Sequence, residues 1–142
     1  MTSTAPCVCT ALRKASRAVS RIYDERLSDS GMTINQFAVL RHISREPRIP
    51  LSRLADLLVM ERTSLYRVLA PLERQGWVVI ESAGPRVKIV SITDAGLAAM
   101  GRATGAWETT QNEILGAVGI SDFRMMEAQL RKLVAVSSEM AS

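Results

Sequence analysis

The stretch from Glu61 to Gln75 constrains the fold most, because its apolar and polar residues separate onto two sides of a helix. The apolar side collects Leu65, Val68, Leu69 and Leu72, and the other side collects Thr63, Arg67, Ala70 and Arg74, flanked by Ser64 and Tyr66. Gly76 and Trp77 follow, in the order that ends a helix with a left-handed residue. We therefore expect a helix that packs through one side and presents hydrogen-bond donors on the other.

Short elements flank this helix. Before it, Ser52 is expected to cap a short helix that runs to Leu58, and a turn follows near Val59. After it, residues 77–80 and 87–92 are rich in β-branched side chains and are separated by turn residues. Two short helices joined by a tight turn and followed by a hairpin are typical of a winged helix-turn-helix, in which the second helix enters the major groove of DNA.

Longer helices are predicted on both sides of this module, over residues 7–27, 34–44 and 94–118 and from Ser121 onward. Their boundaries are marked by capping and helix-breaking residues, namely Gly31, Thr33 with Gln36, Thr93 and Gly119. The predicted order is four helices, a hairpin and two helices. This order gives a mainly α fold with a small β-hairpin wing.

Length, composition and charge bound the class of protein. A chain of 142 residues is about one domain, and 47% apolar with 23% charged residues is an ordinary globular mixture. The sequence has no apolar run long enough to cross a bilayer, and its first ten residues lack the features of a secretory signal, so we expect a cytoplasmic protein without membrane contact. Positions 1 to 90 carry 14 basic and 8 acidic residues, against 4 and 6 afterwards, which favours a basic surface on the first part of the chain.

No catalytic constellation is recognisable in the sequence. His42 is the single histidine, and there is no acid-base pair at motif spacing, no glycine-rich phosphate loop and no cluster of metal ligands. We therefore expect no enzyme activity, no cofactor and no metal site.

The sequence resembles the MarR family of transcriptional regulators. The resemblance lies in Leu54-Ala55-Asp56-Leu57-Leu58, Met60-Glu61-Arg62-Thr63-Ser64-Leu65, Leu72-Glu73-Arg74-Gln75-Gly76-Trp77 and Ser91-Ile92-Thr93-Asp94-Ala95-Gly96. It implies one MarR-like domain over residues 1–142, with a winged helix-turn-helix over 33–93 and an all-helical dimerisation region from both chain ends, 7–30 and 94–140. It also implies a repressor that binds a double-stranded, pseudo-palindromic operator.

A homodimer is also expected from burial. Several apolar residues of the last two helices would stay exposed in a monomer, namely Trp107, Ile114, Leu115, Leu130, Leu133 and Val136. Pairing them between two subunits removes this surface from water.

The resemblance assigns DNA contacts to both the second helix and the wing. Base-edge or groove contacts are implied for Ser64, Tyr66 and Arg67, and phosphate contacts for Ser52, Arg53, Arg62 and Thr63. Arg86 resembles the wing arginine that enters the minor groove, and the basic Lys88 lies beside it. The wing departs from the family pattern at Gly84, where an acidic residue is common, and at Pro85, where a basic one is.

The family usually responds to a small signal, often an aromatic acid, and two kinds of sensor stay open. Arg13, Arg17 and His42 are candidates for a pocket that attracts a carboxylate. The alternative is a thiol-based redox repressor, because Cys9 resembles the start of the peroxide-sensing branch and Tyr23 falls where that branch places a tyrosine near the thiol.

A third alternative is a winged-helix scaffold that binds proteins and no DNA. The donor-rich side of residues 61–75 argues against it, since a scaffold has no need of those groups.

Overall fold

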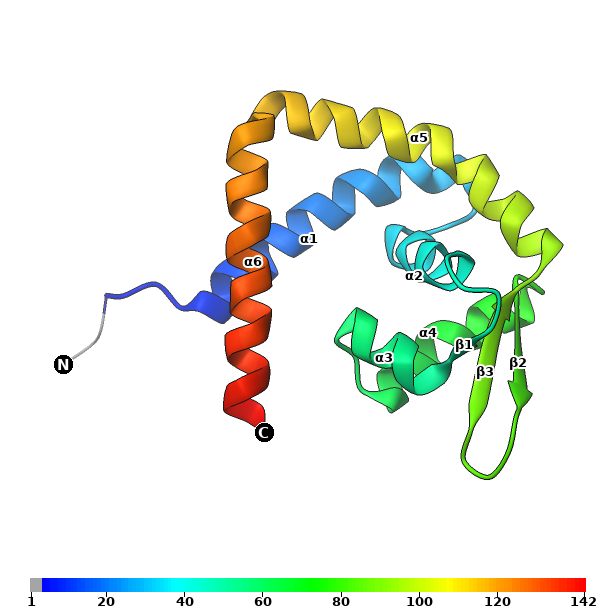
Figure 1. The fold of residues 1–142 in the computed structure, drawn as a ribbon. Coiled ribbons are helices and arrows are strands. Elements are labelled where there is room, and N and C mark those ends of the chain that lie inside the picture. The colour runs from blue at the N-terminus through cyan, green and yellow to red at the C-terminus, as the bar shows by residue number, and fades with distance from the viewer. Residues whose placement is uncertain (1–3) are drawn as a thin grey trace. The chain divides into compact units, whose positions relative to one another are not determined.

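The computed structural model describes residues 4–142, which form a mostly helical chain with one small sheet (Figure 1). Its helices and strands are α1 Val8–Leu27, a 3-10 turn Ser28–Ser30, α2 Ile34–Ser44, β1 Ile49–Pro50, α3 Leu51–Leu58, α4 Arg62–Arg74, β2 Val78–Ser82, β3 Lys88–Ile92, α5 Asp94–Val118 and α6 Ile120–Ala141. The chain divides into two compact units, one that ends at Trp107 and one that begins at Glu108. The predicted fold class is confirmed, since the chain is mainly helical and carries a small β-hairpin wing.

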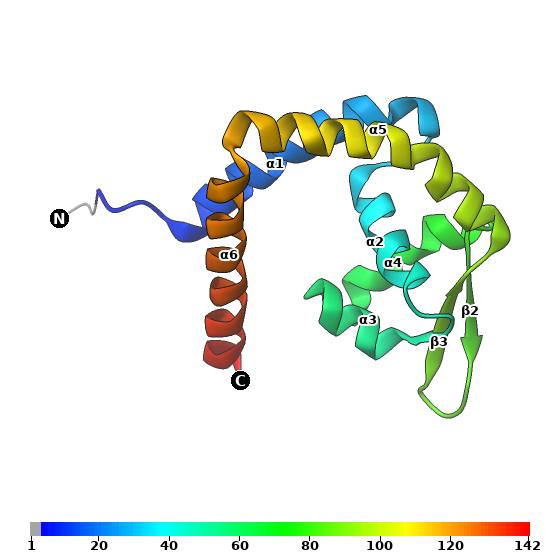
Figure 2. The same ribbon diagram turned by 45° about the horizontal axis from the view of Figure 1, so that its top comes forward.

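The sheet has three antiparallel strands in the order β1-β3-β2. The sequence predicted the hairpin of β2 and β3, which pairs Val78 with Ile92 at its base and Ser82 with Lys88 near its tip. Both ribbon views show this hairpin extending past the start of α3 (Figures 1 and 2). The sequence did not predict β1, in which Ile49 pairs with Val90.

Local capping chemistry sets most helix boundaries. Gly31 adopts the left-handed conformation before α2, and Thr33 forms the predicted capping box with Gln36 through hydrogen bonds of 3.2 and 3.0 Å. At the end of α4, Gly76 is left-handed, and the N–H groups of Gly76 and Trp77 donate to carbonyl oxygens of the last turn. These contacts explain why the sequence located both boundaries.

Two predicted helix starts are wrong, that of α3 by two residues and that of α6 by one. α3 begins at Leu51 with Pro50 in the capping position, so Ser52 lies inside the first turn and does not cap it. Proline suits this place because its fixed φ fits a helix start and its missing N–H removes a donor that the helix would leave unpaired. α6 begins at Ile120, one residue before the expected Ser121, because Gly119 supplies a backbone turn with φ of 96°.

The core of the first unit joins the helix-turn-helix to the sheet and to the start of α5. Its largest fully buried side chains include Phe37, Leu40 and Ile43 of α2, Leu54 of α3, Leu65, Leu69 and Leu72 of α4, and Val78 and Val90 of the sheet. Burying one such side chain contributes about 1.5–3 kcal/mol. Because one side of α4 is anchored in this core, its other side faces solvent.

Trp107 also packs within the chain, which the sequence did not predict. Its ring is half-buried and packs against Phe37 at a centroid distance of 5.4 Å, and the Arg41 guanidinium lies 4.4 Å from the Trp107 centroid. Trp107 therefore belongs to the packing of the first unit in addition to any dimer contact.

The second unit exposes much of its apolar surface. In the described chain, α6 has no buried residue, and Met125, Leu130, Val134 and Val136 are each at least 39% exposed. In the first unit, α1 likewise exposes Val19. Within residues 4–142, no helix combines the length and the apolar character needed to span a membrane.

Candidate nucleic-acid interface

The exposed side of α4 carries the polar groups that the sequence assigned to DNA. Thr63, Tyr66 and Arg67 are exposed and Ser64 is half-buried, while the opposite side is buried. The two-sided character of this helix is thus confirmed. The contacts themselves stay predictions.

The start of α3 favours anions more than that of α4, whose capping position holds the acidic Glu61. Within the part of the chain that the structure describes, no side chain caps either helix, and the sequence places no Asp or Glu in either first turn. The first N–H groups of a helix carry partial positive charge and lack partners inside the helix. Ser52 and Arg53 lie in the first turn of α3, and Arg62 and Thr63 lie in the first turn of α4, next to these donors.

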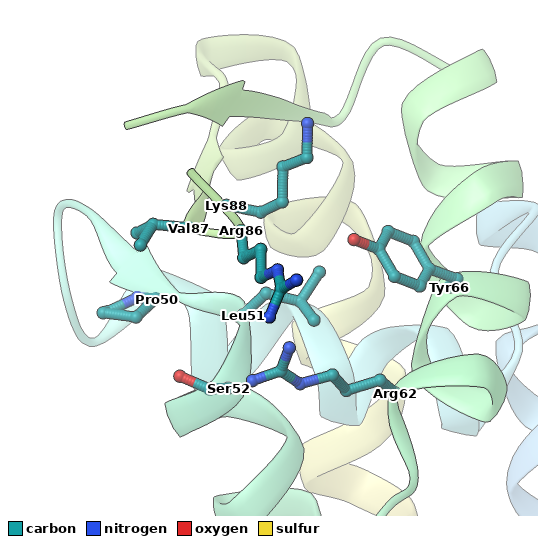
Figure 3. Close-up of a pocket in the computed structure, with 8 residues that line it drawn as sticks. All are labelled: Pro50, Leu51, Ser52, Arg62, Tyr66, Arg86, Val87 and Lys88. Atoms are coloured by element: carbon teal, nitrogen blue, oxygen red, sulfur yellow. The ribbon is translucent and has the colours of Figure 1, made fainter. Parts of the chain in front are cut away.

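A cleft of about 170 Å³ lies between α3, α4 and the wing (Figure 3). Its lining residues are Pro50, Leu51, Ser52, Arg62, Tyr66, Arg86, Val87 and Lys88. The fold therefore brings together five of the residues that the sequence assigned to DNA, from three separate segments. The lining contains three basic residues and no acidic one.

The polar groups of the cleft do not all face the same way. Figure 3 shows the guanidinium groups of Arg62 and Arg86 directed into the cleft, with the Tyr66 hydroxyl turned toward it. The Lys88 ammonium is turned away and donates a 2.6 Å hydrogen bond to the Ser82 Oγ. Lys88 thus lines the cleft with its aliphatic stem.

Arg53 is held by a carboxylate. Its Nε donates to Oε1 of Glu46 at 2.6 Å, and its side chain is 58% exposed. A phosphate contact by Arg53 would have to compete with Glu46.

The wing tip fixes the backbone of Arg86. The Val87 N–H donates to the Gly84 carbonyl oxygen at 3.2 Å, with Pro85 and Arg86 between them, and Arg86 has φ of 62°. Proline at the second position and positive φ at the third are typical of a type II turn, which normally has glycine or asparagine where Arg86 stands. The Gly-Pro turn thus orients the arginine at a position where the sequence lacks the usual acidic partner.

The turn between α3 and α4 is also left-handed. Val59 has φ of 54° and ψ of 47°, although its side chain is 65% exposed and branched at Cβ. This conformation costs about 1–2 kcal/mol for a residue with a Cβ. The turn therefore keeps a geometry suited to glycine although the sequence supplies valine.

The sensor candidates lie apart from the cleft. Arg13 and Arg17 are exposed on α1, and His42 is half-buried with its Nδ1 2.8 Å from the Ala38 carbonyl oxygen. Cys9 is an exposed free thiol at the start of α1, whereas Tyr23 is buried, which raises the pKa of its hydroxyl. The 14 residues between Cys9 and Tyr23 correspond to about 21 Å along a helix, so the two groups are not in contact within one chain.

Sequence reasoning did not predict the hydrogen bonding of the Cys7 thiol or the contact between Arg41 and Trp107. The pKa of the Cys7 thiol is lowered, first by hydrogen bonding to the Thr10 side chain and then by the backbone of Thr10 and Cys9. The position of Cys7 at the start of a helix was the available signal. The contact of Arg41 with Trp107 had no signal in the sequence, because 66 positions separate the two residues.

Comparison with known proteins agrees with the fold. A model described as the MarR family matches residues 30–86, which cover the helix-turn-helix and the first strand and turn of the wing. The chain is 32% identical to the Mycobacterium tuberculosis transcriptional regulator MosR, solved in complex with DNA, with a TM-score of 0.86 over 94% of this chain and 98% of that one.

Two more distant structures share the fold. A mutant of MarR from Escherichia coli complexed with operator DNA is 22% identical, with a TM-score of 0.77 over 89% of this chain and 92% of that one. NadR in complex with 4-hydroxyphenylacetate is 20% identical, with a TM-score of 0.74 over 94% and 96% of the two chains.

Proposed function

The chain belongs to the MarR family of transcriptional regulators, and on that premise we propose that it is a repressor that binds a pseudo-palindromic operator as a homodimer. The observation that carries the proposal is the joining of the exposed side of α4 to a cleft lined by basic and no acidic residues. The DNA complex of MosR, at 32% identity, supports the same role.

The assigned residues divide into those that contact bases and those that bind the DNA backbone or the minor groove. Arg67, with Ser64 and Tyr66, contacts base edges in the major groove, where a guanidinium that makes two hydrogen bonds to guanine discriminates by about 1–3 kcal/mol. The other assigned residues are Ser52, Arg53, Arg62, Thr63, Arg86 and Lys88, which bind the backbone or the minor groove and set the register.

The homodimer places two such surfaces on one duplex. The exposed apolar side chains of α1 and α6, including Val19, Leu130 and Val136, pack between subunits. A two-fold dimer presents its recognition helices about 34 Å apart, one turn of DNA, and so selects half-sites at that spacing.

The signal that releases DNA is a small aromatic acid. The complex of NadR with 4-hydroxyphenylacetate supports this chemistry, and Arg13, Arg17 and His42 are the groups available to attract its carboxylate. A ligand acts by binding the released conformation more tightly than the DNA-bound one.

A thiol signal is the second candidate, and the lowered pKa of Cys7 beside the exposed Cys9 favours it. In this reaction a hydroperoxide transfers one oxygen atom to a cysteine thiolate, which becomes a sulfenate while the hydroperoxide is reduced to an alcohol.

A footprint on the DNA upstream of the protein's own gene tests the proposal. We expect protection of a pseudo-palindromic site that is lost with an aromatic acid such as 4-hydroxyphenylacetate, whereas loss only with peroxide would transfer the signal to the thiols. A protein that binds all genomic fragments equally weakly, even at low ionic strength, would contradict operator recognition and favour the scaffold.

A further inference from the structure

We propose that the cleft between α3, α4 and the wing is a seat for one phosphate group of the DNA backbone, held jointly by Arg62 and Arg86. The inference rests on the proposed DNA binding. It changes the part given to Arg86, from a reader of the minor groove to a ligand of the backbone.

The charges in the cleft lack a counter-ion. Both guanidinium groups point into the same space, and within residues 4–142 neither Arg62 nor Arg86 forms an ion pair. Two cations that converge in this way repel each other, and a phosphate between them replaces the repulsion by attraction. A guanidinium also matches the oxygen spacing of a phosphate, to which it can donate two parallel hydrogen bonds.

Neighbouring arginines show the contrast. Arg48 lies 3.4 Å from a Glu81 carboxylate oxygen, and Arg53 lies 2.6 Å from one of Glu46. Each of these two cations therefore has a carboxylate partner within the chain. Arg62 and Arg86 in the cleft are therefore available to bind an external anion.

The size and the remaining donors of the cleft suit the same anion. Its volume of about 170 Å³ is several times the ~30 Å³ that one water takes in the liquid, which leaves room for a phosphate group. The Tyr66 hydroxyl is turned toward it, and the uncapped first turn of α3 adds backbone N–H donors.

The backbone holds Arg86 toward this seat before DNA arrives. The turn closed between Gly84 and Val87 sets the positive φ of Arg86, and the side chain leaves that turn toward Leu51 and Arg62, as Figure 3 shows. The Arg86 guanidinium is therefore already directed into the cleft without DNA.

A double-mutant cycle measures whether the two arginines share one phosphate. Binding of the full-length protein to a random-sequence duplex is followed by fluorescence anisotropy for wild type, Arg62→Ala, Arg86→Asn and the double variant. Asparagine is chosen because it tolerates positive φ, and the melting temperature of each variant confirms that it is folded. A random duplex suffices because a phosphate contact does not depend on sequence.

We expect each single variant to raise the Kd about tenfold, as for the loss of a hydrogen bond to a charged group. Two independent contacts would raise the Kd of the double variant ~hundredfold, and we expect a much smaller rise because the two arginines share one phosphate. The matched control pairs Arg86→Asn with Arg74→Ala. Arg74 is also exposed on α4, but it does not line the cleft and lies 12 residues from Arg62, about 18 Å along the helix. The effects of Arg86→Asn and Arg74→Ala on the Kd should therefore multiply.

If the effects of the Arg62 and Arg86 variants on the Kd multiply, the two arginines do not share a phosphate. The proposal is also wrong if Arg86→Asn weakens binding only to duplexes rich in A·T pairs. A second arm compares release of the duplex by inorganic phosphate and by chloride at equal ionic strength. Stronger release by phosphate, absent in the double variant, would support a seat that also takes free phosphate, and equal release supports a seat for the DNA phosphodiester alone.

The outcomes separate this inference from the proposed function. If the losses multiply while one genomic fragment is still preferred, the shared seat fails and the operator proposal stands. If the losses are coupled but no fragment is preferred, the phosphate seat stands and operator recognition fails.

Discussion

The Thr93 hydroxyl donates a hydrogen bond of 2.6 Å to the carbonyl oxygen of Gly76. The same hydroxyl accepts a hydrogen bond of 3.0 Å from the Gly96 N–H, so it also caps α5. One side chain thereby joins the residue that ends α4 to the first turn of α5. Since α4 carries the proposed base-reading residues, this bridge fixes where that helix stops and how it meets the long helix.

Replacing Thr93 by Val keeps the shape of the side chain and removes both hydrogen bonds. We expect the free energy of unfolding to fall by about 1–2 kcal/mol, as for other lost N-caps. Thr93→Ser retains the hydroxyl and is the control. Urea unfolding measures both variants, and equal losses would show that the hydroxyl does not matter.

Gly96 lies where α5 crosses the Trp77 backbone, and a Cβ there would overlap the Trp77 carbonyl oxygen. Gly96→Ala should therefore lower the melting temperature. Gly101 lies in the same helix with open space around it, so Gly101→Ala should stabilise by about 0.5–1 kcal/mol through helix propensity. Calorimetry on the pair tests the close approach, and destabilisation by both variants would contradict it.

Val59→Gly should relieve the left-handed strain in the turn between α3 and α4. The gain of about 1–2 kcal/mol is partly offset by the ~0.5–1 kcal/mol entropy cost of glycine, which leaves a modest rise in thermal stability. Val79→Gly, at a half-exposed strand position with ordinary backbone, should destabilise instead. A fall in melting temperature for Val59→Gly would mean that the exposed valine makes favourable contacts.

Arg67→Ala should separate reading of bases from general attraction to DNA. We expect affinity for the operator to fall by about 1–3 kcal/mol, with a smaller change on random duplexes. Arg102→Ala removes an exposed arginine on α5, outside the cleft, and is the control for net charge. Anisotropy titrations give both affinities, and an equal loss on the two duplexes would count against direct readout.

The lowered pKa of Cys7 increases its thiolate fraction at neutral pH. In a Cys9→Ser background, where Cys7 is the single thiol, alkylation by iodoacetamide should slow when Thr10→Val removes the hydroxyl that lowers the pKa. The rate should rise with pH and level off at a lower pH with Thr10 than without it. Mass spectrometry follows the reaction, and coincident pH profiles would exclude the role of Thr10.

Elements whose boundaries depend on neighbouring residues were predictable from the sequence. Thr33 with Gln36, Gly76 with Trp77, and Thr93 each act within one turn of the helix that they cap or end, so their chemistry is visible in the order of residues. The same holds for the two sides of α4, which follow from helical periodicity.

Features made by distant segments were not predictable in this way. β1 forms because Ile49 pairs with Val90 of β3, and its two residues are too few to show a strand pattern. The cleft forms where Ser52, Arg62 and Arg86 come together, and their spacing in the sequence does not predict this. Likewise, Glu46 neutralises Arg53 from a different segment, which periodicity does not reveal.

The edge of the sheet formed by β1 also limits self-association. An approaching strand would meet only two residues there, and the second, Pro50, has no N–H to offer. On the other edge, β2 carries Glu81, whose exposed carboxylate disfavours a neighbouring strand. The winged module is thereby guarded against stacking into fibrils through the edges of its sheet.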